Sequence, residues 1–167
     1  NKKGRIVNDG MVFISEEDGH SIEKCRLNGG EIIIVRSGVN TGDTCVVPRK
    51  YAGHFAGYDI IVEPDDGVIN AVFLNELLNT SYMETVVKPL TIRSAQPHLN
   101  AEQVKALPII DTPLELQNQY ADFVRHADKS KFVAWEATKT AAEAATMMIK
   151  PLFGALGYRK QHREQEK

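Results

Sequence analysis

Three short stretches of the sequence have side chains that could contact the phosphates and base edges of a nucleic acid. The first stretch, residues 36–41, lies between two runs of β-forming residues. The other two stretches are residues 49–58 and residues 88–98, and neither contains Asp or Glu. Arg, Lys, Gln and Asn pair with guanine or adenine edges, and Ser, Thr and Tyr commonly hold phosphates. A plain solvated loop is an alternative of equal weight. The candidate DNA-binding residues are Arg36, Ser37, Asn40, Thr41, Arg49, Lys50, Tyr51, His54, Lys88, Thr91, Arg93, Ser94, Gln96 and His98.

The loop around Gly38 and Gly42 does not match a known nucleotide-binding loop. A Walker loop needs Lys followed by Ser or Thr after its last glycine, whereas Asp43 follows Gly42 and would repel a phosphate. The dinucleotide fingerprint needs a helix after the glycines, and β-forming residues follow here. The pattern therefore predicts a β-hairpin, in which the two glycines either serve only the turn or present a contact surface.

No arrangement typical of an enzyme accompanies these stretches. Cys25 and Cys45 have no CxxC spacing, so we interpret them as packing residues of a protein in a reducing compartment. The histidines show no metal or triad spacing, and ordinary surface or packing roles are favoured for each. We expect no catalytic residue, no metal and no cofactor. The five histidines are His20, His54, His98, His126 and His162.

The composition is typical of a folded cytoplasmic protein. The 167 residues, 43% of them hydrophobic, suffice for one domain with an appended element. A net charge of −2 is unusual for an isolated nucleic-acid binder, so binding would need a local basic patch. No apolar stretch approaches the ~20 residues of a membrane span, and the polar start is not a signal peptide. Because residue 1 is Asn, we expect the chain to be part of a longer protein.

The elements that would position the polar stretches are short strands followed by helices. Residues 69–80 have helical spacing, with Asp65, Asp66 or Gly67 as possible caps. A break would follow, and residues 81–88 could then extend this helix. Asn100 and Gln103 form a plausible capping box before a short helix that Pro108 ends. We expect an α/β (α+β) recognition domain over residues 1–112 with a mixed, twisted, partly closed sheet. Its predicted strands are the runs at 11–15, 31–37, 44–48, 58–64 and 108–110.

The last third predicts one long coiled-coil helix over residues 113–150, followed by a polar, mobile tail at 151–167. No Gly or Pro interrupts the stretch between Pro113 and Pro151, which would give a helix about 55 Å long. Small and apolar residues alternate at steps of three and four, a spacing typical of a seam that packs against a second helix. The predicted helix-pairing residues are Leu116, Tyr120, Phe123, Ala127, Ala134, Ala137, Ala141, Ala144 and Met148, with Ser130 in the same register.

The order of three motifs resembles the target recognition domain and conserved helix of type I restriction-modification specificity subunits. The stretch GGEIIIVRSGVNTGDTCVVP is similar to the family's Gly-Asp-Ile…Arg-Ser-Gly…Gly…Val-Pro hairpin. The stretch RSAQPHLNAEQVKALPI is similar to its Gln-Pro-x-Leu segment, and TPLELQNQYADFV to its Pro-Leu-x-x-Gln helix start. The resemblance covers roughly residues 27–150. Departures are Glu31 in place of Asp, Asp43 where a polar or basic residue is usual, and Leu116 in place of an acidic residue.

The resemblance implies a non-catalytic protein that binds double-stranded DNA in a sequence-specific manner. Such a protein reads one half of a bipartite site, and its helix sets the distance to a second recognition half, or to a homodimer partner. It also docks methyltransferase and restriction (nuclease) subunits. The chain could be a half-subunit, the C-terminal half of a subunit, or the specificity region of an adenine-N6 DNA methyltransferase. A coiled-coil module that binds only protein is the alternative from another class.

Overall fold

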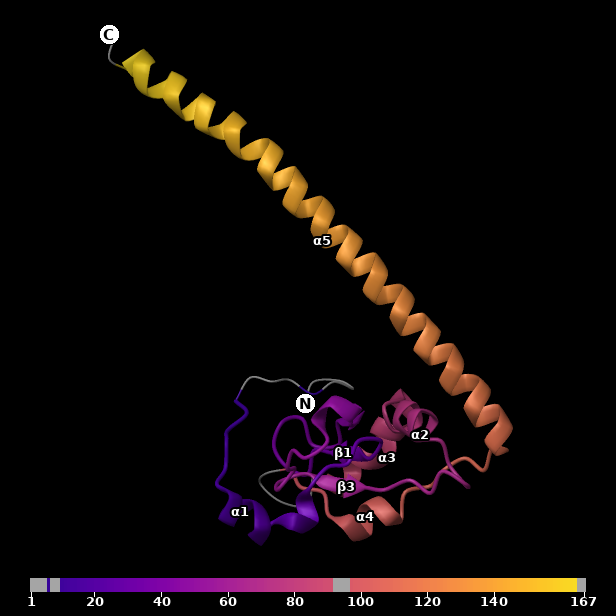
Figure 1. The fold of residues 1–167 in the computed structure, drawn as a ribbon. Coiled ribbons are helices and arrows are strands. Elements are labelled where there is room, and N and C mark those ends of the chain that lie inside the picture. Colours follow the sequence, from indigo (N-terminus) through magenta and orange to yellow (C-terminus); the bar gives the residue numbers. More distant parts are fainter. Residues whose placement is uncertain (1–5, 7–9, 92–96, 165–167) are drawn as a thin grey trace. The chain divides into compact units, whose positions relative to one another are not determined.

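The chain forms two compact units, residues 1–122 and residues 123–167, which we call the head and the distal helix. The structure is a computed structural model. It describes residue 6, residues 10–91 and residues 97–164, with side chains up to residue 145 and at residue 147. Along the chain the elements are α1 (Glu16–Ser21), η1 (Glu23–Cys25), β1 (Ile32–Ile34), β2 (Thr44–Val46), η2 (Arg49–Tyr51), β3 (Ile60–Val62), α2 (Ala71–Leu78), α3 (Ser81–Thr91), α4 (Ala101–Lys105) and α5 (Leu114–Glu164) (Figure 1).

The sheet of the head has three antiparallel strands in the order β2-β1-β3. Ile32 pairs with Val46 and Val62, and Ile34 pairs with Thr44 and Ile60, so β1 lies in the centre. The head is therefore α+β, as predicted. The predicted mixed and partly closed sheet is wrong, because all pairing is antiparallel and each strand has only three residues.

Two of the predicted strands do not form in the structure. Residues 11–14 belong to no regular element and are exposed, and Ser15 caps α1 by accepting a hydrogen bond from the Asp18 backbone N–H at 3.0 Å. β-Forming residues thus occur here without a neighbouring strand to pair with. Residues 108–110 also lie outside any strand. Pro108 has no backbone N–H to donate to a ladder, which disfavours pairing at the start of this segment.

Each face of the sheet covers its own apolar cluster, as the two-residue period of a strand requires. Ile32 and Ile34 point to the cluster formed with α2 and α3. This cluster includes Met83 of α3, which is 0% exposed. Ile33 points to the opposite cluster, which contains Leu27, Cys45, Val47 and Tyr51. Because β1 is buried on both faces, its position fixes the hairpin that follows it.

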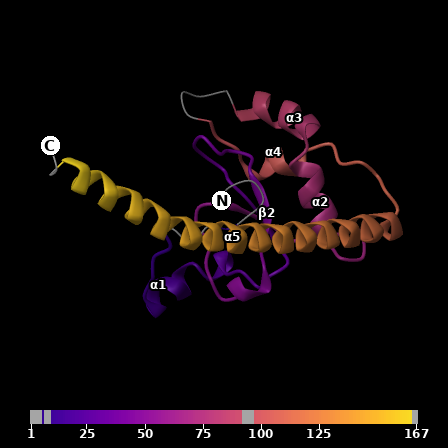
Figure 2. The same ribbon diagram turned by 90° about the horizontal axis from the view of Figure 1, so that it is seen from above.

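Three short helices pack beside the sheet. Asn70 caps α2 by accepting from the backbone N–H groups of Val72 and Phe73, so the predicted caps at residues 65–67 are wrong. Asp65 instead accepts from the Gly67 backbone N–H. The predicted extension after a break is confirmed, since α3 begins at Ser81 after α2 has ended. α4 lies beside the C-terminal part of α3 in both views (Figure 1, Figure 2).

The predicted capping box of α4 is confirmed. Asn100 Oδ1 accepts from the Gln103 backbone N–H at 2.9 Å, and Gln103 Oε1 accepts from the Asn100 backbone N–H at 2.9 Å. Gln103 Nε2 also donates to the Leu90 carbonyl at 3.0 Å. One side chain therefore satisfies the start of α4 and ties it to the end of α3.

The long helix predicted for the last third is confirmed. α5 begins one residue after Pro113, whose carbonyl accepts from the Leu116 and Gln117 backbone N–H groups. It continues through Pro151 to Glu164, beyond the predicted end at 150 and into the segment predicted as a polar tail. Of the helices in the described ranges, none combines the length and apolarity that crossing a membrane needs.

Candidate nucleic-acid interface

The loop between β1 and β2, which we call the hairpin tip (residues 36–42), is joined to residues 97–99. Ser37 and His98 form an isolated antiparallel bridge. The Leu99 backbone N–H donates to the Arg36 carbonyl at 2.7 Å, and the Gly38 N–H donates to the Pro97 carbonyl at 3.4 Å. The first and third polar stretches, which are about sixty residues apart in the sequence, thus meet at one end of the sheet.

Side chains reinforce this junction. Arg36 Nη2 lies 3.4 Å from His98 Nε2, and a guanidinium can only donate, so the ring nitrogen is the acceptor. The Thr41 hydroxyl lies 2.6 Å from the Gly38 carbonyl and 3.3 Å from the Pro97 carbonyl, and can donate to either. The Thr41 side chain therefore links the turn to the neighbouring segment.

The turn depends on Gly42. Its φ is +95°, and a Cβ there would lie 3.0 Å from Val87 Cγ1 on α3. A side chain would therefore meet both a left-handed backbone and a neighbouring helix. Gly42 lets the tip pack closely against α3, which fixes the direction in which the tip projects.

The outer side of the hairpin tip is exposed and uncharged apart from Arg36. Arg36 and Asn40 are exposed, and Val39 is 99% exposed. In the described part of the chain, Arg36 has no carboxylate within ion-pair distance. Val39 is not among the predicted contact residues, although a lone apolar residue within a polar loop is a visible signal in the sequence.

The second polar stretch lies at the opposite end of the sheet. Arg49 and Lys50 belong to η2, which follows β2, and a Cβ on Gly29 would lie 2.8 Å from Arg49 Cα. Gly29 and Arg36 flank β1 on either side and are seven residues apart, which at about 3.3 Å per residue is roughly 20 Å. The structure therefore does not bring Arg49 and Lys50 to the hairpin tip.

Tyr51 and His54 belong to the packing of that end. Tyr51 is buried in the cluster around Ile33, its ring meets the His54 ring edge-on at 5.3 Å, and Lys50 Nζ lies 5.0 Å from its centroid. The aromatic ring of Tyr51 is thus a core element rather than an exposed contact. Lys50 remains exposed.

The third polar stretch is divided. Lys88 lies on α3 in an exposed ion pair with Glu84 at 3.7 Å, and Thr91 is buried, with its hydroxyl donating to the Lys88 carbonyl. His98 reaches the hairpin tip as described above. Arg93, Ser94 and Gln96 lie outside the described residues.

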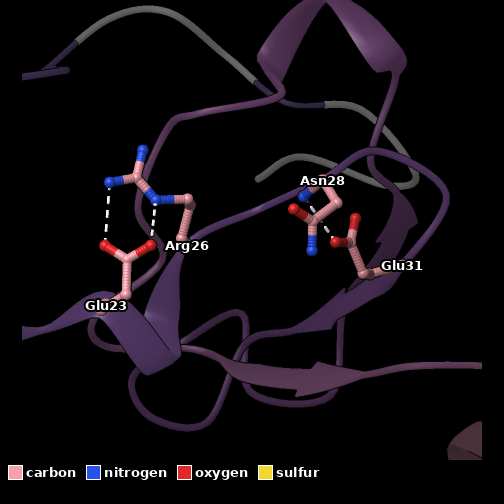
Figure 3. A network of polar contacts seen from close by, with 4 residues as sticks. All are labelled: Glu23, Arg26, Asn28 and Glu31. Carbon is pink, nitrogen blue, oxygen red and sulfur yellow. Dashed lines mark hydrogen bonds and ion pairs between the residues drawn. The ribbon is translucent and has the colours of Figure 1, made fainter.

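Two acidic residues organise the turn before β1 (Figure 3). The buried Glu31 carboxylate accepts from the backbone N–H groups of Asn28, at 2.5 Å, and Gly29, at 2.7 Å. Glu23 accepts two hydrogen bonds from Arg26, and these bonds lower the pKa of the Glu23 carboxyl. Arg26 also lies over the Phe55 ring, 4.7 Å from its centroid. Its charge is therefore already neutralised within the head.

Burial raises the pKa of two ionisable groups at the sheet, Cys45 on β2 and Asp59 just before β3. Burial raises the pKa of the Cys45 thiol to about 11, so it stays protonated and is a poor nucleophile. Burial likewise raises the pKa of Asp59, whose charge adds to the shift at Cys45. Among the residues that the structure describes, no three His, Cys, Asp or Glu side chains gather as a metal site would require.

Gln117 fixes the start of α5 on the head. Its side chain is 3% exposed; Oε1 accepts from the Asn70 backbone N–H at 2.8 Å, and Nε2 donates to the carbonyls of Val68 (3.2 Å) and Thr112 (2.7 Å). Asn70 Nδ2 also donates to Asn118 Oδ1 at 2.7 Å. The beginning of the long helix is therefore tied to the beginning of α2.

The predicted helix-pairing residues follow one side of α5 and are mostly exposed in the single chain. Tyr120 meets the Phe73 ring edge-on at 5.9 Å, and Ala127 is half-buried. The Met148 side chain lies outside the described ones. The exposed members are Leu116, Tyr120, Phe123, Ala134, Ala137, Ala141 and Ala144.

Neither the models of protein families nor the curated proteins gave a match to this chain.

Proposed function

We propose that this chain is the specificity element of a type I restriction-modification or DNA methyltransferase complex. It would read half of a double-stranded DNA target and catalyse no reaction itself. Its partners would be methyltransferase and nuclease subunits, with a second recognition half or a second copy packed along α5. A specificity region within an adenine-N6 methyltransferase chain is a variant of the same proposal.

The observation that supports DNA binding best is the junction between the hairpin tip and residues 97–99. It gathers Arg36, Asn40 and His98 on an exposed surface. One acidic residue, Asp43, follows the tip, and its backbone N–H donates to the Asn40 carbonyl at 2.9 Å. A local surface of this kind is what a nearly neutral chain needs to bind a polyanion.

The helix supports the spacer part of the proposal. α5 has 51 residues, which corresponds to about 77 Å at 1.5 Å per residue. Two DNA turns span roughly 70 Å. The helix is therefore long enough to separate two recognition units that contact successive turns on one side of a duplex.

A duplex titration at two ionic strengths tests the DNA-binding proposal. A labelled random 30-base-pair duplex should bind the full chain, and its affinity should fall at least tenfold between 50 and 200 mM salt as counterions return to the phosphates. Arg36→Ala should weaken binding. Arg26→Ala is the matched control, because the same charge is lost where Glu23 already neutralises it. Absence of binding at both salt concentrations contradicts the proposal.

Exposed aromatic residues on α5 favour one second candidate, a protein-interaction module. Phe132 and Trp135 are 62% and 59% exposed, and aromatic side chains are enriched at protein interfaces. Such a module would self-associate or bind a partner helix without binding duplex DNA at any salt concentration. Sedimentation analysis beside the titration separates these two functions.

A further inference from the structure

We infer that the hairpin tip is the element that enters the major groove, and that Arg36, oriented by His98, reads a guanine there. This inference rests on the proposed DNA-binding function and adds which element makes base contacts and to which base. Arg36 would be the specificity-determining residue and His98 a positioning residue.

The geometry around Arg36 supports this role. His98 Nε2 accepts from one terminal nitrogen at 3.4 Å, which restrains a long side chain that is otherwise exposed. In the described part of the chain, Arg36 lacks a carboxylate partner. Its other N–H donors therefore have no charged competitor. The O6 and N7 atoms of guanine form the acceptor pair that an arginine fork binds most often.

The shape of the element fits the major groove. The hairpin tip extends beyond the three-stranded sheet as the loop that joins β1 to β2, and the major groove, about 12 Å wide, admits an element as narrow as a β-hairpin. Val39 at the tip is 99% exposed and would find an apolar contact in the 5-methyl group of a thymine. Val39 and Arg36 lie on the same tip, so both would contact bases in one groove. The two residues together support base readout by the tip better than either residue alone.

The second polar stretch fits this role less well. Tyr51 is buried, Lys50 lies against its ring, and the segment is at the opposite end of the sheet. A Lys or Arg at that end would at most reach the DNA backbone, where contacts position a protein without reading sequence. Arg49 therefore offers a control of equal charge.

The test is selection from a pool of duplexes with a randomised 20-base-pair segment, using the full chain. The wild type, Arg36→Lys and the control Arg49→Lys are compared, and each variant is first checked for a native circular dichroism spectrum. We expect Arg36→Lys to lose the preference for one guanine by about tenfold, because lysine keeps the charge but lacks the fork. Arg49→Lys should select the wild-type sequence.

Modified bases give a readout that does not depend on any variant. Replacing the selected guanine by 7-deazaguanine removes the N7 acceptor and should weaken wild-type binding about tenfold, with little effect on Arg36→Lys. Replacing a selected thymine by uracil should weaken the wild type and not Val39→Ala. For the positioning residue, His98→Phe should relax the guanine preference, and His98→Gln, which restores an acceptor, should recover part of it.

The outcomes separate the inference from the proposed function. If Arg36→Lys selects the same sequence and 7-deazaguanine has no effect, the inference is overturned while DNA binding stands. Salt-dependent binding without any sequence preference in the wild type also overturns it. If the wild type binds no duplex, both proposals fail.

Discussion

The head and the distal helix differ in where they place large apolar side chains. In the head, Ile32, Met83 and Leu99 are almost entirely buried around the sheet. In the distal helix, Phe132, Val133 and Trp135 are all more than half exposed. The head can therefore gain stability from its own contacts, whereas the helix leaves most of its apolar surface to water. The difference indicates which unit folds by itself and which depends on a partner for tertiary stability.

The largest expected effect is the difference between truncating an apolar side chain in the head and truncating one in the distal helix. Ile32→Ala should destabilise the head by about 2–5 kcal/mol, because it removes buried methyl groups and leaves a cavity. Phe132→Ala in the monomeric chain should change the free energy of unfolding by less than about 0.5 kcal/mol. Urea denaturation followed by circular dichroism and intrinsic fluorescence measures both changes.

A cost above 2 kcal/mol for Phe132→Ala at low protein concentration would break the comparison, because it would mean that the distal helix is packed within one chain. If that cost appears only as the concentration rises, it locates Phe132 in an interface between copies. Sedimentation at the same concentrations distinguishes the two outcomes.

The next effect concerns the place where α5 begins. Gln117→Ala should cost about 2 kcal/mol, since it leaves the half-buried Asn70 N–H and Thr112 carbonyl without the partners that the buried Gln117 side chain provides. Gln119→Ala, two residues away and exposed, is the matched control and should be nearly neutral. Thermal unfolding of both variants measures the difference. Equal effects would show that the start of α5 is not held by this hydrogen-bond network.

The sequence was most informative where local signals decide the structure. Asn100 and Gln103 predict the cap of α4, and the long stretch without Gly or Pro predicts α5, because both depend on neighbours within a few residues. The strand predicted at residues 11–15 failed, since pairing depends on a partner that composition does not reveal. The continuation of α5 through Pro151 was also not predicted, because the proline alone was used to place the end of the helix.

The candidate interface was predictable only in part. The residue types at 36–41 and 88–98 singled out the hairpin tip and His98, but not that a bridge joins them. Tyr51 was grouped with exposed residues because its burial depends on which way η2 packs. Gln117 is the last residue of the Pro-Leu-x-x-Gln motif, but the motif does not predict its contacts with residues nearly fifty positions away.

The smallest effect compares two cysteines within the head. Burial raises the pKa of Cys45 to about 11, while in the unfolded chain a thiol has a pKa near 8.5. Above pH 8.5 the unfolded state thus loses its proton first, so the stability that Cys45 contributes is complete below that pH and declines up to pH 11. The free energy of unfolding should fall by about 0.7 kcal/mol between pH 8 and pH 9 from this group, and Cys45→Ala should lack that part of the decline.

At pH 8 a chromogenic disulfide reagent should modify the half-buried Cys25 well before Cys45, because reaction at Cys45 requires opening of the head. Equal rates of modification of Cys25 and Cys45 in the folded protein would mean that the cluster around Ile33 opens readily. Only the other face of the sheet would then be tightly packed, and the contrast with the exposed distal helix would hold for that face alone.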